Sequence, residues 1–152
     1  RAALERMGAR RRGHIVFVSS LSGRRGLARM SAYASSKGAL HILSQVLRLE
    51  AAAVGVHVSE VLPISVRTGF FDAAENRSAR PYRPSGLVLT PERVAESIVA
   101  CLRRPRAEVY PSLWSRLAPI LDALFPDLTA RLLSWHERRG GAAPAQERPA
   151  PG

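Results

Sequence analysis

Cysteine and lysine each occur only once among the 152 residues, at Cys101 and Lys37. A single cysteine excludes an internal disulfide framework and favours a reducing compartment. The four histidines are spread along the chain without the spacing of metal ligands, so no metal site is predicted. No stretch has the pattern of a signal peptide, and no apolar run is long enough to cross a bilayer. These absences favour a cytoplasmic globular protein.

Acidic side chains are also few, with 12 Asp and Glu against 23 Lys and Arg, and the formal net charge is +11. Such an excess can indicate binding to nucleic acid or to an anionic membrane. The arginines are scattered, however, and lack the interleaved aromatic residues of a nucleic-acid surface. We therefore interpret them as a basic solvated surface and predict no nucleic-acid partner.

The lone Lys37 ends the sequence Tyr-Ala-Ser-Ser-Lys, which begins at Tyr33. On a helix, residues four apart share a face, so an ammonium would lie beside a phenol. A neighbouring cation favours the charged form of a phenol, whose pKa is otherwise ~10, and brings proton exchange closer to neutral pH. A compact ammonium suits this role better than the planar guanidinium that the chain uses elsewhere. The spacing alone also fits a surface pair, so the flanking sequence decides between the two interpretations.

The flanks supply two strand-like runs. Residues 13–20 read Gly-His-Ile-Val-Phe-Val-Ser-Ser, and Ser20 precedes Tyr33 by 13 positions. Residues 56–68 read Val-His-Val-Ser-Glu-Val-Leu-Pro-Ile-Ser-Val-Arg-Thr, a second strand pattern followed by a proline turn. This order of motifs resembles the second half of a classical short-chain dehydrogenase/reductase, over about residues 5–110. The combination is specific because the strands, serine, Tyr-x-x-x-Lys and proline turn all follow that family's order.

The resemblance implies an α/β fold, a Rossmann-like doubly wound parallel sheet, of which this chain holds only the C-terminal half. The family's Gly-rich turn, which binds the dinucleotide pyrophosphate, cannot be placed on the sequence. We therefore expect the N-terminal cofactor-binding half to be missing, in a portion of a larger enzyme or a truncated product. Residues 1–110 are assigned to the Rossmann-like part, 111–136 to a helical extension packing on the domain or its lid, and 137–152 to a disordered tail.

The activity implied by the resemblance is hydride transfer between NAD or NADP and an alcohol or ketone. Tyr33 would exchange a proton with the substrate oxygen, and Lys37 would assist it and bind the nicotinamide ribose. Ser20 would orient the substrate oxygen. The implied cofactor-binding residues are Tyr33, Lys37, Pro63, Ile64, Val66 and Thr68, and the implied substrate-binding residues are Ser20, Phe70 and Phe71.

The sequence departs from the family at Ile64, where glycine is usual. A β-branched side chain there would crowd the nicotinamide or shift the loop. Together with the missing pyrophosphate turn, this departure keeps an inactive fragment or pseudoenzyme as one alternative. A second alternative is a basic module that binds a membrane surface or nucleic acid through its arginines and residues 112–136.

Two apolar segments favour a hydrophobic substrate. Residues 69–89 include two phenylalanines and are interpreted as a lid over the substrate. Residues 112–136 are apolar and edged by arginines, and Pro119 and Pro126 are expected to break them into short helices. Three roles remain open for this second segment: closing the substrate pocket, covering a second subunit, or contacting a membrane surface.

The helix around Tyr33 is predicted to begin with Ser31 as its N-cap and to end near Ala53, before Gly55. It is apolar on two sides, so we expect it to have two packing partners, one of which is the sheet. The resemblance implies that the other partner is a second subunit, in a homodimer or homotetramer. His41, on the Tyr33 face, is interpreted as a helix-surface residue.

Four shorter segments complete the prediction. The continuous apolar run at 15–18 predicts a strand buried on both faces. The arginines of the loop at 21–30 are expected to be solvated. Thr90 followed by Pro91 predicts a helix start, and residues 107–110 predict a final short strand.

Overall fold

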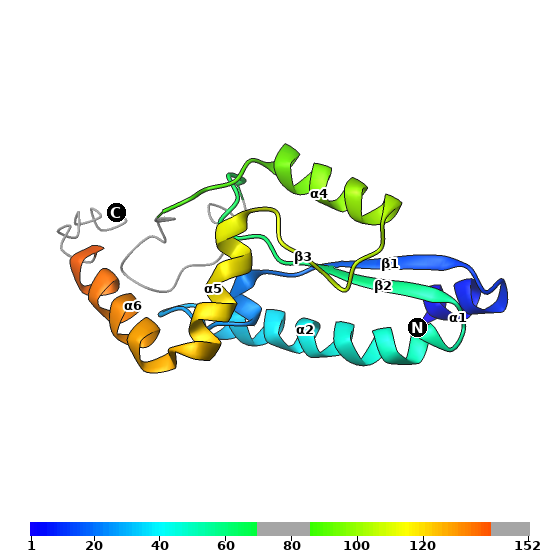
Figure 1. Cartoon of the computed structure of the whole chain (residues 1–152), viewed down its shortest axis with the longest axis horizontal. Coiled ribbons are helices and arrows are strands. Elements are labelled where there is room, and N and C mark those ends of the chain that lie inside the picture. Colours follow the sequence, from blue (N-terminus) through cyan, green and yellow to red (C-terminus); the bar gives the residue numbers. More distant parts are fainter. Residues whose placement is uncertain (70–85, 141–152) are drawn as a thin grey trace, which may run out of the picture.

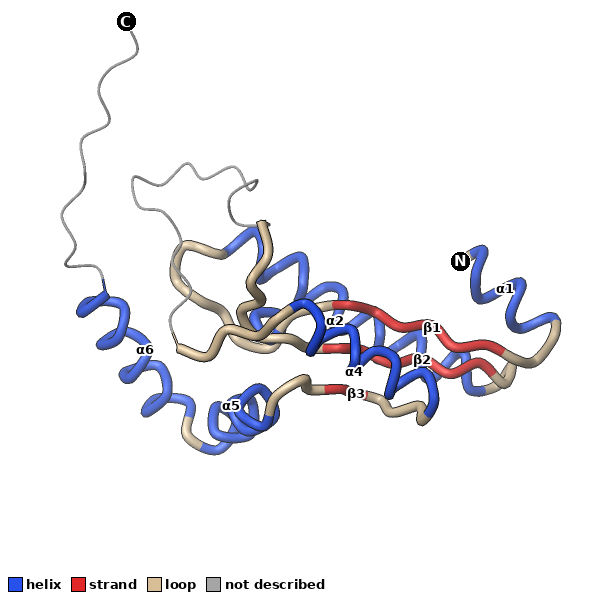
Figure 2. The backbone as a smooth tube through the Cα atoms, turned by 90° about the horizontal axis from the view of Figure 1, so that it is seen from above, coloured by secondary structure: helices blue, strands red, loops and turns tan. Residues whose placement is uncertain are grey.

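The structure is a computed structural model that describes residues 1–69 and 86–140. Its centre is a three-stranded parallel sheet in the order β1-β2-β3, with helices on both faces (Figures 1 and 2). The elements are α1 (Ala2–Ala9), β1 (Gly13–Val18), the 3-10 helix η1 (Leu21–Gly23), α2 (Ser31–Ala52), β2 (Val56–Val61), α4 (Pro91–Arg103), β3 (Glu108–Val109), α5 (Leu113–Leu124) and α6 (Pro126–Gly140).

The three strands run in the same direction and end at the same edge of the sheet. β1 pairs with β2 from Gly13 opposite Val56 to Val18 opposite Val61, and β3 continues the sheet with Val109 opposite Val61. Parallel neighbours need a crossover connection, and α2 is the crossover between β1 and β2. The strand–helix–strand unit and the parallel α/β fold expected from the sequence are therefore confirmed.

Alternation along the strands gives the sheet two apolar faces. Helices α2 and α4 cover opposite faces (Figure 1). The α2 face buries Ala51, Val56 and Val58, with partly buried residues of α1 and β1 packed around them. The α4 face buries Val61, Leu89 and Val94, joined by Val16, Ile64, Val66, Ile98 and Val109.

The prediction that the first strand is buried on both faces is wrong. β1 is an edge strand within the described part of the chain, and its residues are half-buried. Val18 at its carboxyl end is 47% exposed. Residues on both faces of β1 pack against the two apolar clusters but are only partly buried, and among the described residues only β2 pairs with the strand.

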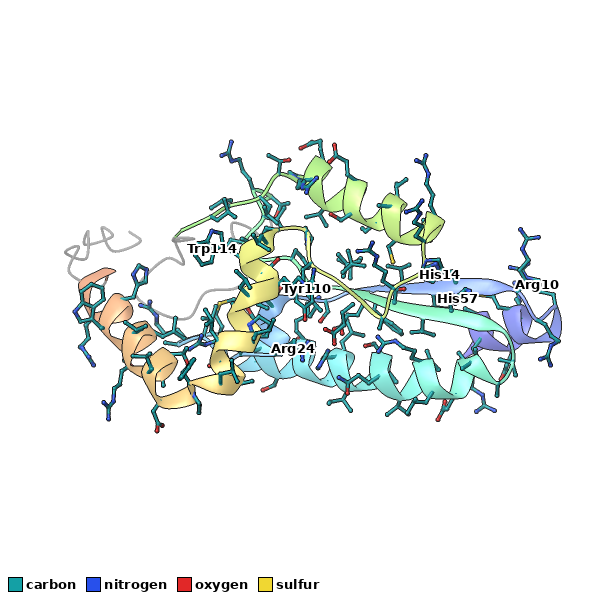
Figure 3. All side chains as sticks on the ribbon, in the orientation of Figure 1. Arg10, His14, Arg24, His57, Tyr110 and Trp114 are labelled. Carbon is teal, nitrogen blue, oxygen red and sulfur yellow. The ribbon has the colours of Figure 1, made fainter. Side chains whose placement is uncertain are left out.

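Three polar side chains of β1 and β2, those of His14, His57 and Ser59, meet on the α4 face. The rings of His14 and His57 stack edge-on at 5.9 Å between centroids (Figure 3). His14 Nε2 lies 2.7 Å from Ser59 Oγ, within hydrogen-bond distance. Burial, and then the nearby His57, lowers the pKa of His14 below its ordinary value.

The helix start predicted from the sequence is correct for α4 and wrong for α2. Thr90 caps α4 by accepting a hydrogen bond from the N–H of Arg93 at 3.3 Å, with Pro91 in the first turn as expected. Ser31 is not the N-cap of α2 but its first residue, and Met30 precedes it without a capping side chain. Gly55 follows α2 in a left-handed conformation (φ +71°) that favours glycine.

The C-terminal segment forms two helices, with one break instead of two. Pro119 lies inside α5, and only Pro126 interrupts the chain, at the start of α6. A proline within a helix removes one N–H donor, which costs stability without forcing a break. α6 continues to Gly140, so residues 137–140 of the expected tail are helical, and residues 141–152 lie outside the described part.

Several helices expose apolar side chains. On α2 the exposed residues are Ile42, Leu43, Val46 and Leu49, of which Leu49 is 78% exposed. On α5 and α6 they include Trp114, Leu124, Leu128 and Trp135. Within the described ranges, no helix combines the length and apolar character that crossing a bilayer requires.

Candidate active site

A cavity of about 690 Å³ lies at the carboxyl ends of β1 and β2, where open parallel sheets place their ligands. It brings together every described residue that the sequence predicted for the site: Ser20, Tyr33, Lys37, Pro63, Ile64, Val66 and Thr68. Phe70 and Phe71, and the rest of the expected lid up to residue 85, lie outside the described residues.

Tyr33 and Lys37 share the face of α2 that is turned to this cavity. Lys37 Nζ lies 5.7 Å from the centroid of the Tyr33 ring. It also donates a hydrogen bond to the carbonyl of Val18, the last residue of β1, at 3.3 Å. The ammonium is therefore tethered to the end of the strand and held over the phenol.

The two serines after β1 have different hydrogen bonds. The Ser19 hydroxyl donates to the main-chain carbonyl of Lys37 at 3.3 Å and so ties the strand end to α2. Ser20 Oγ accepts from the N–H of Ser22 at 3.2 Å, as the N-cap of η1. Because Ser20 Oγ only accepts in this bond, its O–H remains able to donate. Ser20 lines the cavity although only 7% of its surface is exposed.

Gly23 allows η1 to lie directly on α2. A Cβ built at Gly23 would be 2.6 Å from the carbonyl carbon and oxygen of Lys37, which are backbone atoms that cannot move aside cheaply. Gly38 faces the same contact from the helix. The absence of side chains at both positions therefore sets the distance between the Ser20 turn and the Tyr33–Lys37 helix.

The segment after β2 forms the opposite wall of the cavity. The N–H of Leu21 donates to the carbonyl of Pro63 at 2.9 Å, joining the two strand ends. Ile64 lines the cavity but also packs against the buried cluster on the α4 face. Part of its side chain is therefore engaged in the core.

The C-terminal helices also contribute to the cavity. Trp114 and Ala118 of α5, and Leu133 and His136 of α6, line it. Three roles were left open for residues 112–136, and these contacts favour closing the pocket. Sequence reasoning did not single out Trp114 or His136, because helical apolar spacing does not tell which face of a helix meets a pocket formed by residues far away in the chain.

His41 is not a surface residue. Its exposed fraction is 7%, and its Nδ1 lies 2.6 Å from Oε2 of Glu60, which is fully buried on β2. The Ser44 hydroxyl donates to the same oxygen at 3.1 Å, and Gln45 Nε2 lies 3.0 Å from His41 Nε2. The side of α2 that carries His41 faces the sheet, so a polar group there needs a partner, and Glu60 provides it.

Two arginines of the loop after β1 are paired instead of solvated. Arg24 Nη1 lies 2.6 Å from Oε2 of Glu108, and Arg25 Nη2 lies 3.3 Å from Oδ1 of Asp122 on α5. Both partners are far away in the sequence, so the pattern of the loop alone could not show them. These ion pairs hold the loop that follows Ser20 against β3 and α5.

The donor set suits the nicotinamide end of a dinucleotide. The Lys37 ammonium can donate to ribose hydroxyls, and the Thr68 hydroxyl and the main chain after Pro63 can meet a carboxamide. The described residues contain no Gly-rich turn at a helix N-terminus for the pyrophosphate. The residues present therefore fit one end of such a cofactor.

Comparison with known proteins gives a consistent family. The family model for short chain dehydrogenase matches residues 1–79. An uncharacterized oxidoreductase of Bacillus subtilis is 34% identical over 127 residues, 80% of this chain and 35% of its own length. Dehydrogenase/reductase SDR family member 7B of Danio rerio is 32% identical over 91% of this chain and 46% of its own length. The 3-ketodihydrosphingosine reductase of Bos taurus is 39% identical over 65% of this chain and 31% of its own.

Solved structures agree with these relatives. A short-chain dehydrogenase from Sphingobium yanoikuyae in complex with NADPH superposes with a TM-score of 0.62 at 26% identity, over 83% of this chain and 50% of that one. A short-chain dehydrogenase from Streptomyces avermitilis gives a TM-score of 0.62 at 25% identity, over 91% and 55%. The chain thus spans about half the length of these structures, and less than half the length of the curated relatives.

Proposed function

The chain belongs to the short-chain dehydrogenase family of oxidoreductases, and from this premise we propose that it carries the proton-transfer and substrate half of a carbonyl reductase site. The observation that supports the proposal best is the shared cavity of Ser20, Tyr33 and Lys37 at the carboxyl ends of the strands. A phenol, an ammonium and a hydroxyl that converge on one cavity are the groups that carbonyl reduction needs.

Each of the three side chains has a separate role in this proposal. Ser20 donates its O–H to the substrate carbonyl and holds that oxygen near the phenol. Tyr33 gives its phenolic proton to the oxygen as the carbon is reduced, and takes a proton back when an alcohol is oxidised. Lys37 stabilises negative charge on the phenol oxygen and donates to the ribose of the cofactor.

A nicotinamide dinucleotide, when bound, supplies or accepts the hydride. NAD and NADP are both compatible with the residues of the cavity. Pro63, Ile64, Val66 and Thr68 would position the nicotinamide from the wall opposite α2.

The substrate in this proposal is a hydrophobic ketone or alcohol. The cavity wall includes Leu27, Met30, Trp114 and Leu133, which are apolar and surround the reactive groups. A relative named as a reductase of a long-chain ketone, 3-ketodihydrosphingosine, supports the same substrate class.

The test is carbonyl reduction followed through the nicotinamide absorbance, with ketones of increasing alkyl length and with NADH and NADPH in parallel. We expect the rate to rise with alkyl length and Tyr33→Phe to lower it by roughly 10²-fold or more, the range of general acid catalysis. Tyr110→Phe is the matched control, because Tyr110 lies outside this cavity and should leave the rate nearly unchanged. A preference for small polar alcohols would remove the substrate class, and an active Tyr33→Phe variant would remove the mechanism.

A second candidate function is a non-catalytic member of the family. The observation that favours it is that no pyrophosphate cradle occurs in the described residues, so the site fits only one end of the cofactor. Titration with NADPH, followed by its own fluorescence, separates the two. Binding that weakens on Lys37→Met supports the enzyme, and no binding by either the 152-residue chain or the full product of its gene supports the non-catalytic protein.

A further inference from the structure

A second cavity, of about 650 Å³, lies between β3, the loop after β1 and α5. It shares no lining residue with the candidate active site, and α5 contributes to both. Its polar lining residues are Arg24, Arg106, Glu108, Tyr110 and Arg116. Three guanidinium groups and one carboxylate around an otherwise apolar hollow are the features that need an explanation.

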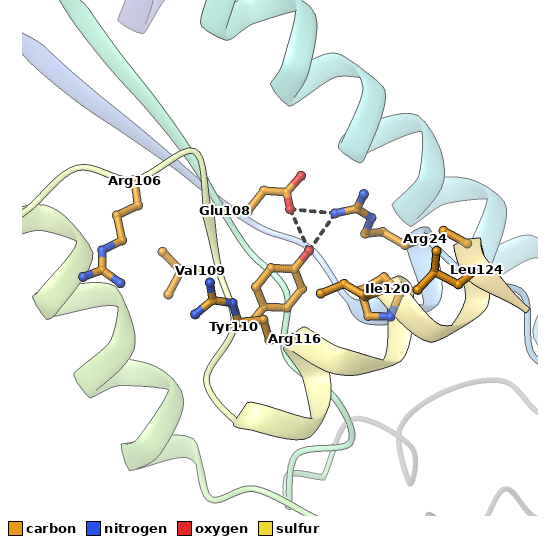
Figure 4. A pocket seen from close by; sticks show the side chains of 10 residues that line it. Arg24, Arg106, Glu108, Val109, Tyr110, Arg116, Ile120 and Leu124 are labelled. Carbon is orange, nitrogen blue, oxygen red and sulfur yellow. Dashed lines mark hydrogen bonds and ion pairs between the residues drawn. The ribbon is translucent and has the colours of Figure 1, made fainter.

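The carboxylate of this cavity is already neutralised. Oε2 of Glu108 accepts hydrogen bonds from Arg24 Nη1 and from the Tyr110 hydroxyl, both at 2.6 Å, and Arg24 Nη1 also donates to the Tyr110 oxygen at 2.6 Å (Figure 4). Burial, and then the bond to Glu108, raises the pKa of Tyr110 to about 12, so the phenol is uncharged. One of the three arginines is therefore matched by the one acid.

The other two arginines, Arg106 and Arg116, keep an unbalanced charge at the same cavity. Neither has an ion pair or hydrogen bond within the described part of the chain, and Glu108 is the only acid among the described residues that line the cavity. Figure 4 shows Arg116 beside the Tyr110 ring, with Arg24 directed at Glu108 on the other side of the phenol. The described lining residues thus give the cavity a net charge of +2, from three arginines and one glutamate.

The rest of the wall is apolar. Val109, Pro119, Ile120 and Leu124 face the cavity, and Ile120 and Leu124 are 50% and 64% exposed. We propose that this cavity binds an amphiphilic anion, a carboxylate, phosphate or sulfate on a hydrocarbon chain. Arg106 and Arg116 hold the anionic head through charge-assisted hydrogen bonds, and the hydrocarbon covers the α5 wall.

The composition of the cavity separates this ligand class from simpler ones. An inorganic anion would use the two arginines and leave the α5 wall in water, and a neutral alkyl compound would leave two guanidinium groups beside an apolar group. The volume falls within the range of small-molecule sites, roughly 300–1,000 Å³. An anionic head and a hydrocarbon tail on one molecule match both the two arginines and the apolar wall of the cavity.

The first test needs no variant. Calorimetric titration of the 152-residue chain is made with decyl phosphate kept below its micelle concentration, with hexyl phosphate, with decanol and with inorganic phosphate. We expect decyl phosphate to bind more tightly than the other three, and its affinity to fall as salt is added. Equal affinity for inorganic phosphate would overturn the apolar part of the proposal, and equal affinity for decanol would overturn the charged part.

The second test removes the head-group contacts. Arg106→Gln and Arg116→Gln should each weaken decyl phosphate binding by roughly tenfold or more, the amount expected of a hydrogen bond between charged groups. Arg104→Gln is the matched control, since Arg104 is exposed, close in sequence and absent from the cavity wall. Circular dichroism confirms that the variants fold, and unchanged binding in folded Arg106→Gln and Arg116→Gln would overturn the site.

The source of the anion is distinguished by competition. Vesicles that contain phosphatidic acid are added to the chain loaded with decyl phosphate. Displacement assigns the site to lipid head groups, and no displacement assigns it to a free amphiphile; either result supports the cavity. The titrations contain no nicotinamide cofactor, so their failure leaves the proposed reductase untouched, and the loss of reductase activity would leave this site untouched.

Discussion

Individual side chains of this chain are positioned by partners that lie far away in the sequence. Tyr33 and Lys37 are an exception, because their spacing on one helix is visible in the sequence and predicts a shared face. Ser20 could be assigned to the same site from the order of the family motifs in the sequence. His41 and Glu60, or Arg24 and Glu108, are pairs between different elements, and no local pattern in the sequence predicts them.

The buried pair of His41 and Glu60 leads to a stability prediction. His41→Leu leaves a fully buried carboxylate without its closest partner, so the free energy of unfolding should fall by roughly 3 kcal/mol. Replacing both residues by leucine should cost less than His41→Leu alone, because no buried charge is left unpaired. Urea unfolding of the single and double variants measures both values. A double variant less stable than the single one would show that the pair is not coupled in this way.

His14 leads to a prediction of pH dependence. Burial and the nearby His57 lower the pKa of His14 in the folded chain, so the unfolded chain takes up the proton first as the pH falls. The free energy of unfolding should therefore decrease as the pH is lowered through about 6.5, the ordinary histidine value. Chemical unfolding at about pH 8 and at about pH 5.5 gives the difference. His14→Gln should show a smaller decrease than the unchanged chain, and an equal decrease in both would contradict the assignment.

At the scale of elements, the arrangement at the strand ends depends on the contact between η1 and α2. Gly23→Ala would bring a methyl group against the Lys37 carbonyl and move the Ser20 turn away from Tyr33. We expect carbonyl reduction to fall on the order of tenfold or more, since small displacements of reacting groups have large effects on rate. Gly26→Ala is the matched control, because a Cβ at Gly26 meets nothing within 4 Å. Equal rates for the two variants would contradict the role given to this contact.

The strands and helices themselves could be predicted well from the sequence. Apolar runs ended by serine or proline predicted β1 and β2, and a threonine before Pro91 predicted the start of α4. The prediction failed where an element depends on what covers it. The apolar run of β1 indicates burial that three strands do not provide, and Pro119 was expected to end a helix that continues through it.

Considered as a whole molecule, the described part of the chain leaves much apolar helix surface exposed. The outer face of α2, with Ile42, Leu43, Val46 and Leu49, has no partner among the described residues, and the helix was expected to need a second one. We expect this face to pair with a second copy. Ile42→Glu with Leu49→Glu should lower the mass found by sedimentation equilibrium to that of one chain. Leu128→Glu, on the exposed side of α6, should leave the mass unchanged, and a single-chain mass before any substitution would exclude the dimer.

The relation between the chain and its family also belongs to this scale. The chain spans about half the length of the solved structures it matches, and it contains the cavity in which Ser20, Tyr33 and Lys37 meet. The family and the parallel α/β fold could be recognised from the order of motifs alone. The second cavity could not, because Arg24, Glu108 and Arg116 come from three separate elements.

The central claim is that Tyr33 supplies the proton for hydride transfer to a carbonyl carbon in this cavity. It is tested most directly with a reduced nicotinamide cofactor deuterated at the transferable position and a long-chain ketone, on the 152-residue chain and on the full product of its gene. Mass spectrometry of the alcohol should show deuterium on the carbinol carbon with Tyr33 present and almost none with Tyr33→Phe. Deuterium transfer at the same rate in both, or transfer by neither form of the protein, would contradict the account.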